Sequence, residues 1–158
     1  MKRAPTGSHT WLVLWKSARA VEARALESIA DTGLCASDFG VLEALLHKGP
    51  LPVNALGKKL LLTSGSITTA VDRLAARRLV RRTNDPHDRR VRVVELTALG
   101  RKLIVPAFTR HEADLELLAS ALTRAERVTL ATLLRKLGKA AETTQATHTA
   151  REEIGEAS

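Results

Sequence analysis

A helical pattern that passes directly into a β-hairpin pattern constrains the fold more than any other feature of this chain. Residues 64–79, SGSITTAVDRLAARRL, place apolar side chains at three- and four-residue intervals, which indicates an amphipathic helix. Two short runs with β-branched and other apolar residues, RRLVRRT and VRVVELT, then flank the tip NDPHDRR, where Asp85-Pro86 predicts a turn. The domain must therefore attach a small hairpin to the end of a helix.

Three further helical patterns precede this segment. Apolar residues recur at helical spacing over residues 13–29. A second helix is predicted over residues 38–48, with Ser37 as its N-cap and Gly49-Pro50 as its stop. A third, short helix is predicted over residues 52–60, where proline occupies the first turn. The order is therefore three helices, a polar-faced fourth helix and a hairpin.

Two longer helices are predicted after the hairpin. Thr97 is a suitable N-cap for a fifth helix ending near residue 122, in which Pro106 should introduce a kink. Thr123 caps a sixth helix over residues 124–142. The leucine stripes at both chain ends exceed what a small monomeric domain can bury, which predicts a homodimer.

Composition and charge narrow the class of protein. The formal net charge is +8 and the pI about 10.4, which favours an anionic partner: nucleic acid, or less often an acidic membrane surface. The single cysteine, Cys35, excludes an intramolecular disulfide and fits a reducing compartment. The apolar run from Trp11 to Trp15 is too short for a signal peptide, and no stretch approaches the roughly 20 apolar residues of a membrane span. We expect a cytoplasmic protein that does not enter a membrane.

The expected fold class is mainly α with a small β-hairpin wing, that is, a winged helix-turn-helix plus a helical dimerisation domain. In such a fold the fourth helix enters the major groove, and its first residues lie against base edges. Small hydrogen-bonding side chains suit that position. The predicted DNA-binding residues of this helix are Thr63, Ser64, Ser66, Thr68, Thr69 and Arg73. The alternative is an ordinary capped helix with a solvated polar face.

The hairpin favours the DNA-binding interpretation. Seven arginines fall between Arg77 and Arg92, and Arg89 and Arg90 follow the predicted turn. A narrow minor groove has enhanced negative potential, and arginine is the residue usually inserted there. Asp88 would be repelled by phosphates, so we expect it to pair with Arg90 and orient the guanidinium. The alternative is a solvated hairpin whose charges only maintain solubility.

The predicted fourth helix and the hairpin together resemble a known protein family. The segment LTSGSITTAVDRLAARRLVRRTNDPHDRRVRVVELTALGRKL is similar to the MarR family of bacterial transcriptional regulators, whose wing reads D-x-R, a strand and then L-T-x-x-G. The resemblance implies a homodimer formed by the first, fifth and sixth helices, with Arg90 in the minor groove and Asp88 as its partner. Ala98-Leu99 departs from the pattern, because many members carry acidic residues there.

These interpretations predict four regions. Residues 1–36 form the N-terminal helix of the dimerisation region, residues 37–97 the DNA-binding domain and residues 98–145 the C-terminal dimerisation helices. Residues 146–158 form a polar tail that is either frayed helix or disordered. Twofold symmetry would place two recognition helices about one DNA turn apart, roughly 34 Å. The expected partner is therefore double-stranded DNA with a pseudo-palindromic operator.

The family resemblance also implies an effector. Members commonly release DNA when a small aromatic or phenolic compound binds, or when a cysteine is oxidised, and residues 39–74 resemble a branch that responds to quinones or catechols. Candidate pocket or sensor residues are Trp11, Trp15, Cys35 and His47. For the two tryptophans the alternative is core packing, and for the cysteine it is a role as a small buried hydrophobe.

Other functions find little support. There is no glycine-rich phosphate loop and no evident nucleophile–base pair, so no enzyme and no cofactor are expected. The histidines share no metal-ligand spacing, so no metal is expected. The expected function is a DNA-binding repressor released by a small aromatic ligand. The alternatives are an architectural DNA-binding protein without sequence preference and a redox-sensing repressor that acts through Cys35.

Overall fold

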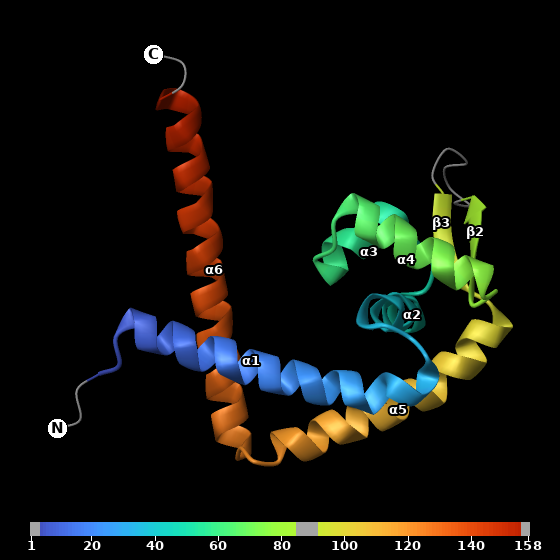
Figure 1. The fold of residues 1–158 in the computed structure, drawn as a ribbon, viewed down its shortest axis with the longest axis horizontal. Helices are drawn as coiled ribbons and strands as arrows, with labels where there is room; N and C mark the ends of the chain where they lie inside the picture. Colours follow the sequence, from blue (N-terminus) through green and yellow to red (C-terminus); the bar gives the residue numbers. More distant parts are fainter. Residues whose placement is uncertain (1–3, 85–91, 156–158) are drawn as a thin grey trace. The chain divides into compact units, whose positions relative to one another are not determined.

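The protein is described by a computed structural model that covers residues 4–84 and 92–155, with side chains to residue 143. It divides into two compact units, Met1–Leu115 and Glu116–Ser158, and each is described by itself. A 3-10 turn over Ala30–Thr32 follows the first helix. The helices and strands in chain order (Figure 1) are α1 (Gly7–Ile29), α2 (Ala36–Lys48), β1 (Leu51–Pro52), α3 (Val53–Leu60), α4 (Ser64–Ala76), β2 (Val80–Asn84), β3 (Arg92–Leu96), α5 (Ala98–Ala119) and α6 (Arg124–Gly155).

The predicted fold class is confirmed, with one strand more than the sequence indicated. The hairpin strands β2 and β3 are joined by β1 in an antiparallel sheet of order β1-β3-β2. In the added strand Leu51 pairs with Val94 and Pro52 with Val93. Two residues are too few to leave a periodic pattern, and proline is tolerated because β1 is an edge strand. Through β1, the wing is connected to the start of α3.

The core of the first unit lies between the helices α2, α3 and α4 and the sheet. Leu42 and Leu45 of α2, Leu56 of α3 and Leu74 of α4 are fully buried, as is Ile104 of α5. Burial of such a side chain stabilises the fold by about 1.5–3 kcal/mol each. This core fixes α4 against α2 and α3, so its outer face has a defined position.

The start of α5 is fastened to the wing by Thr97, the predicted N-cap. Its hydroxyl accepts a hydrogen bond from the backbone N–H of Gly100 at 3.0 Å and donates to the carbonyl oxygen of Arg78 at 2.7 Å. The backbone N–H of Thr97 also donates to the carbonyl oxygen of Leu79 at 3.1 Å. The helix then runs through Pro106 to Ala119, three residues short of the predicted end.

The second unit contains the end of α5 and the long helix α6. Thr123 and Glu126 form the capping box that begins α6: the glutamate carboxylate accepts from the backbone N–H of Thr123 at 2.8 Å, and the threonine hydroxyl accepts from the N–H of Glu126 at 3.3 Å. The backbone hydrogen bond from Thr123, and next the one from its hydroxyl, lower the pKa of Glu126. The backbone of α6 stays helical to Gly155, well past the predicted end at residue 142.

One cap prediction was wrong. The N-cap of α2 is Cys35, with an extended backbone at φ −81° and ψ 167°, and Ser37 lies inside the helix. Because the helix begins at Ala36, the Ser37 hydroxyl does not cap it and lies 3.2 Å from a guanidinium nitrogen of Arg73 and 3.2 Å from the Cys35 sulfur. Among the described residues, no helix has the length and apolarity that crossing a membrane requires.

Candidate nucleic-acid interface

Helix α4 presents a row of small hydroxyl side chains at its N-terminal end. Thr63 is its N-cap, and its hydroxyl accepts from the backbone N–H of Ser66 at 3.2 Å. Ser64, Ser66, Thr68 and Thr69 are all exposed on the same first two turns. The hydroxyl side chains that the sequence analysis predicted to contact DNA are therefore accessible on α4.

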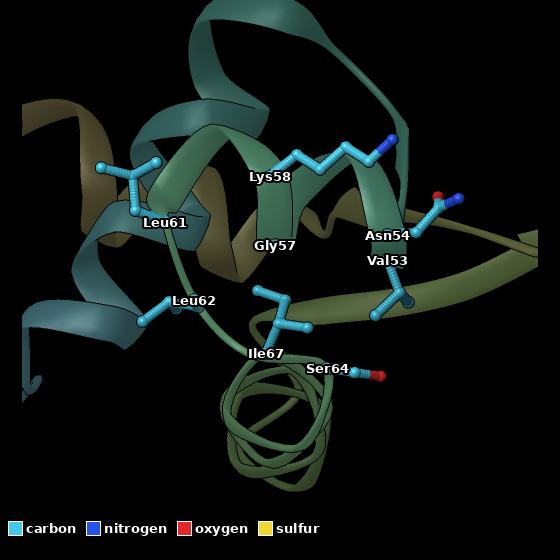
Figure 2. A pocket seen from close by; sticks show the side chains of 8 residues that line it. All are labelled: Val53, Asn54, Gly57, Lys58, Leu61, Leu62, Ser64 and Ile67. Carbon is cyan, nitrogen blue, oxygen red and sulfur yellow. The ribbon is translucent and has the colours of Figure 1, made fainter. Parts of the chain in front are cut away.

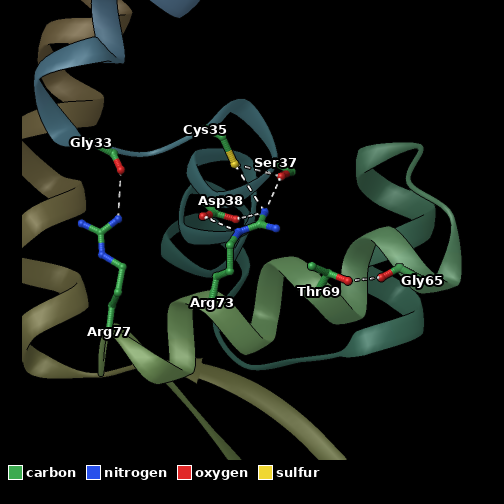
Figure 3. Close-up of polar contacts among 8 residues, drawn as sticks. All are labelled: Gly33, Cys35, Ser37, Asp38, Gly65, Thr69, Arg73 and Arg77. Atoms are coloured by element: carbon green, nitrogen blue, oxygen red, sulfur yellow. Dashed lines mark hydrogen bonds and ion pairs between the residues drawn. The ribbon is translucent and has the colours of Figure 1, made fainter.

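The threonine hydroxyls of this surface are oriented by the helix itself. Thr68 donates to the carbonyl oxygen of Ser64 at 2.8 Å. Thr69 donates to the carbonyl oxygen of Gly65 at 2.9 Å, as Figure 3 shows. With their protons directed at the backbone, these oxygens present lone pairs outward as hydrogen-bond acceptors. Gly65, in the first turn of α4, has open space where a side chain would begin. The surface can therefore approach another molecule closely and accept hydrogen bonds from it.

The opposite face of α4 is buried. Ile67, Ala70, Val71 and Leu74 are each at most 1% exposed. A Cβ on Gly57 of α3 would lie 3.2 Å from the Ile67 side chain, so the glycine permits the close approach of α3 to α4. Burial of one face leaves the hydroxyl face, together with Asp72 and Arg73 further along α4, accessible to an outside partner.

A cavity of about 620 Å³ lies between α3 and the start of α4 (Figure 2). Its polar lining includes Asn54 and Lys58 of α3 and Ser64 of α4. Leu61 borders it in a left-handed backbone conformation, with φ 54°, at the turn between the two helices. The sequence analysis did not single out Asn54 or Lys58. The available signal was the basic pair KK at the end of the predicted third helix.

Arg73, predicted to contact DNA, is engaged within the fold. Its Nη2 donates to Asp38 Oδ1 at 2.6 Å, and its Nε to Asp38 Oδ2 at 3.2 Å (Figure 3). The same Nη2 lies 3.2 Å from the Ser37 hydroxyl and 3.4 Å from the Cys35 sulfur. The hydrogen bond with Asp38 raises the pKa of Arg73 above its ordinary value. Arg73 therefore connects α4 to the first turn of α2.

Several arginines of the basic segment are paired with acids. Arg81 of β2 lies 2.6 Å from Glu95 of β3, and Arg82 lies 2.6 Å from Asp72 of α4. These partly exposed pairs offset part of the positive charge at the base of the wing. The predicted wing-tip residues Asp88, Arg89 and Arg90 lie outside the described residues.

The candidate pocket or sensor residues do not come together in one site. Trp11 and Trp15 are 63% and 45% exposed on α1, so the alternative of core packing is wrong for the single chain. Cys35 is exposed at the start of α2, which contradicts the alternative of a buried hydrophobe. His47 lies at the other end of α2, where its ring packs edge-on against Phe108 with 4.6 Å between centroids. Among the described residues, no cluster of ligating side chains could hold a metal ion.

Comparisons with known proteins agree with this geometry. A family model described as "MarR family" matches residues 32–91. The chain is 35% identical over 128 residues to the HTH-type transcriptional regulator MhqR of Bacillus subtilis, covering 81% of this chain and 88% of the relative.

Two solved structures share the fold. Bordetella bronchiseptica BpsR, studied for the regulation of its DNA binding by 6-hydroxynicotinic acid, aligns with a TM-score of 0.74 and 28% identity over 87% of this chain and 98% of its own. A mutant of MarR from E. coli, in complex with operator DNA, aligns with a TM-score of 0.71 and 25% identity over 79% of this chain and 90% of its own. The chain belongs to the MarR family of transcriptional regulators.

Proposed function

We propose that the protein is a homodimeric, sequence-specific DNA-binding repressor whose helix α4 enters the major groove. The observation that carries this proposal is the division of α4 into a buried apolar face and an exposed hydroxyl face. The proposed base-contacting residues are Thr63, Ser64, Ser66, Thr68 and Thr69. As acceptors, the oriented threonine oxygens would favour the amino groups of adenine or cytosine in the major groove. Repression is proposed because it is the commoner role in the family.

Two further contacts would position the protein on the duplex. Asn54 and Lys58 border the cavity beside the start of α4 and are suited to a backbone phosphate there. The wing would place Arg89 and Arg90 in the adjacent minor groove, with Asp88 orienting Arg90. In support, the strands that lead to this segment, β2 and β3, are paired in register up to Asn84 and Arg92.

Dimer formation is supported by apolar side chains that the chain leaves uncovered. In the first unit α1 exposes Trp11, Leu12, Val13, Trp15, Val21 and Leu26. In the second unit α6 exposes Val128, Leu130, Leu133, Leu134 and Leu137. Exposed apolar surface on this scale marks a protein–protein interface. We propose that α1, α5 and α6 of two chains form it, that residues 37–97 form the DNA-binding domain, and that the operator is correspondingly pseudo-palindromic.

The proposed signal for release is a small aromatic acid, phenol or quinone. Its support is the similarity to BpsR, whose DNA binding is regulated by 6-hydroxynicotinic acid. A second candidate signal is oxidation of Cys35. The specific observation in its favour is that the exposed Cys35 sulfur lies 3.4 Å from Arg73 of α4. Release by peroxide that persists in a Cys35→Ser variant would remove the second candidate.

Selection of duplexes from a random pool, followed by competition, tests the function. The wild-type protein should enrich one duplex and retain it in the presence of excess random DNA, with an affinity advantage of roughly 10³-fold or more. A protein without sequence preference would lose the labelled duplex to the competitor. That result would indicate an architectural DNA-binding protein without sequence preference instead of a sequence-specific regulator.

A further inference from the structure

Two arginines of α4 reach back to one short segment of the chain. Arg73 binds the carboxylate of Asp38 through two nitrogens, at 2.6 and 3.2 Å. Arg77, which ends α4 one turn later, donates to the carbonyl oxygen of Gly33 at 3.0 Å. Residues four apart lie on the same side of a helix, so both side chains leave α4 toward residues 33–38 (Figure 3). This segment connects the 3-10 turn after α1 with α2.

The carboxylate of Asp38 is unusual because it is buried. Asp38 is 4% exposed, and among the described residues it is the one polar or charged residue that is buried. A carboxylate removed from water requires a cation or several hydrogen-bond donors. Here Arg73 supplies two donors in the forked geometry that suits a carboxylate. If the guanidinium moved to a DNA phosphate, the charge of Asp38 would stay buried without its partner.

The geometry points to Arg73 as a positioning residue of the DNA-binding surface, with Arg77 as a second point of attachment. We propose that Arg73, by binding Asp38, fixes the orientation of α4 on α2 and does not itself contact DNA. This inference rests on the proposed function, because α4 is taken as the recognition helix. Arg73 would then stabilise the DNA-binding surface of α4, whereas the sequence analysis predicted that Arg73 contacts DNA.

Single and double substitutions of Arg73 and Asp38 distinguish a positioning role of Arg73 from direct contact with DNA. Arg73→Met leaves Asp38 buried and uncompensated, and should weaken binding to the selected duplex by roughly tenfold or more. Asp38→Asn should weaken it as well, although it removes a negative charge. The double variant Asp38→Leu with Arg73→Met replaces the ion pair by apolar packing, which proteins often tolerate. It should bind within about threefold of the wild type.

A DNA contact predicts the opposite pattern. If Arg73 contacts DNA, the double variant binds as weakly as Arg73→Met, and Asp38→Asn binds as well as the wild type or better. The salt dependence of binding is a second measurement. Loss of a phosphate contact makes the plot of log K against log salt shallower, by about 1 unit of slope, whereas loss of a positioning residue leaves the slope unchanged. A shallower salt dependence in Arg73→Met than in the wild type would overturn the proposal.

The matched control is an exposed pair of the same charges away from α4. Arg110 lies 2.5 Å from Asp31, and both side chains are more than half exposed. Arg110→Met should leave the affinity and the salt slope unchanged; a loss equal to that of Arg73→Met would mean that net charge alone explains the effect.

Hydrogen exchange of the α4 amides, measured without DNA, keeps the inference separate from the proposed function. Exchange should accelerate in Arg73→Met and return to the wild-type rate in the double variant. Unaltered exchange in Arg73→Met would overturn the positioning role even if the protein binds its operator. If the wild type enriches no duplex, the proposed function fails, and the exchange result still decides whether Arg73 holds α4.

Discussion

Replacement of Gly100 by alanine tests how the wing is joined to α5. Gly100 lies in the first turn of α5 and is buried against the backbone that leads into β2. A Cβ at this position would lie 2.0 Å from the carbonyl oxygen of Leu79 and 2.9 Å from its carbonyl carbon. Both atoms belong to the backbone, so no side-chain rotation can relieve the clash.

The size of the effect follows from these distances. An ordinary contact of 3.4 Å requires the two elements to separate by about 1.4 Å. That movement would stretch the hydrogen bonds from Thr97 to Leu79 and Arg78, which tie α5 to the wing. Overpacking costs about 1–3 kcal/mol, and each lost hydrogen bond about 1 kcal/mol. We expect a loss of about 3–5 kcal/mol in the free energy of unfolding.

Thermal unfolding followed by circular dichroism measures this loss. At about 2–4 °C per kcal/mol for a chain of this size, the Tm of Gly100→Ala should fall by roughly 6–20 °C. Gly65→Ala is the matched control, because an added Cβ there meets nothing within 4 Å and alanine favours a helix. A Gly100→Ala variant that melts within about 2 °C of the wild type, which corresponds to about 1 kcal/mol or less, would refute the reasoning.

Three further predictions concern the DNA-binding surface, the dimer and the start of α6. Gly65→Ala should keep or raise the Tm yet weaken binding to the selected duplex at least about fivefold, because its Cβ would occupy space needed for close approach to DNA; unchanged affinity in a binding titration would show that the duplex stays clear of Gly65. Leu133→Glu should yield monomers in analytical ultracentrifugation, since Leu133 is 57% exposed on α6 among other uncovered apolar residues; a dimer that persists would place the interface elsewhere. The pKa of Glu126 is lowered in the folded chain, so its contribution to stability is present above its unfolded value of about 4.5 and is lost as the pH falls through the lower folded value. The Tm difference between the wild type and Glu126→Gln should therefore be largest near neutral pH and shrink below about pH 4.5, and a difference independent of pH would contradict the capping role.

Local signals in the sequence predicted much of the fold. The caps Thr97 and Thr123 were each predicted, because a cap depends on a hydroxyl and a backbone N–H two or three residues later. The buried face of α4 was predicted from its spacing for the same reason: helix periodicity is a property of neighbouring residues. The hydroxyl surface of the candidate interface follows directly from these two local features.

Features that depend on distant residues were missed. Strand β1 exists because Leu51 pairs with Val94, a residue far along the chain. Ser37 does not cap α2, because the helix begins at Ala36, and its hydroxyl contacts Arg73, 36 residues away. The pairing of Arg73 with Asp38 has the same origin. Sequence spacing shows that such side chains are present, but the packing of α2 on α4 decides which of them meet.

We propose that the hydroxyl face of α4 contacts base edges in two symmetric half-sites of the operator. The most direct measurement is the affinity of the wild type and of Thr69→Ala for the selected duplex and for each of its single-base-pair variants. We expect Thr69→Ala to lose about 1–3 kcal/mol of discrimination at one position in each half-site, with half-sites about one helical turn apart. Equal weakening at every position, or a selected duplex without twofold symmetry, would contradict it.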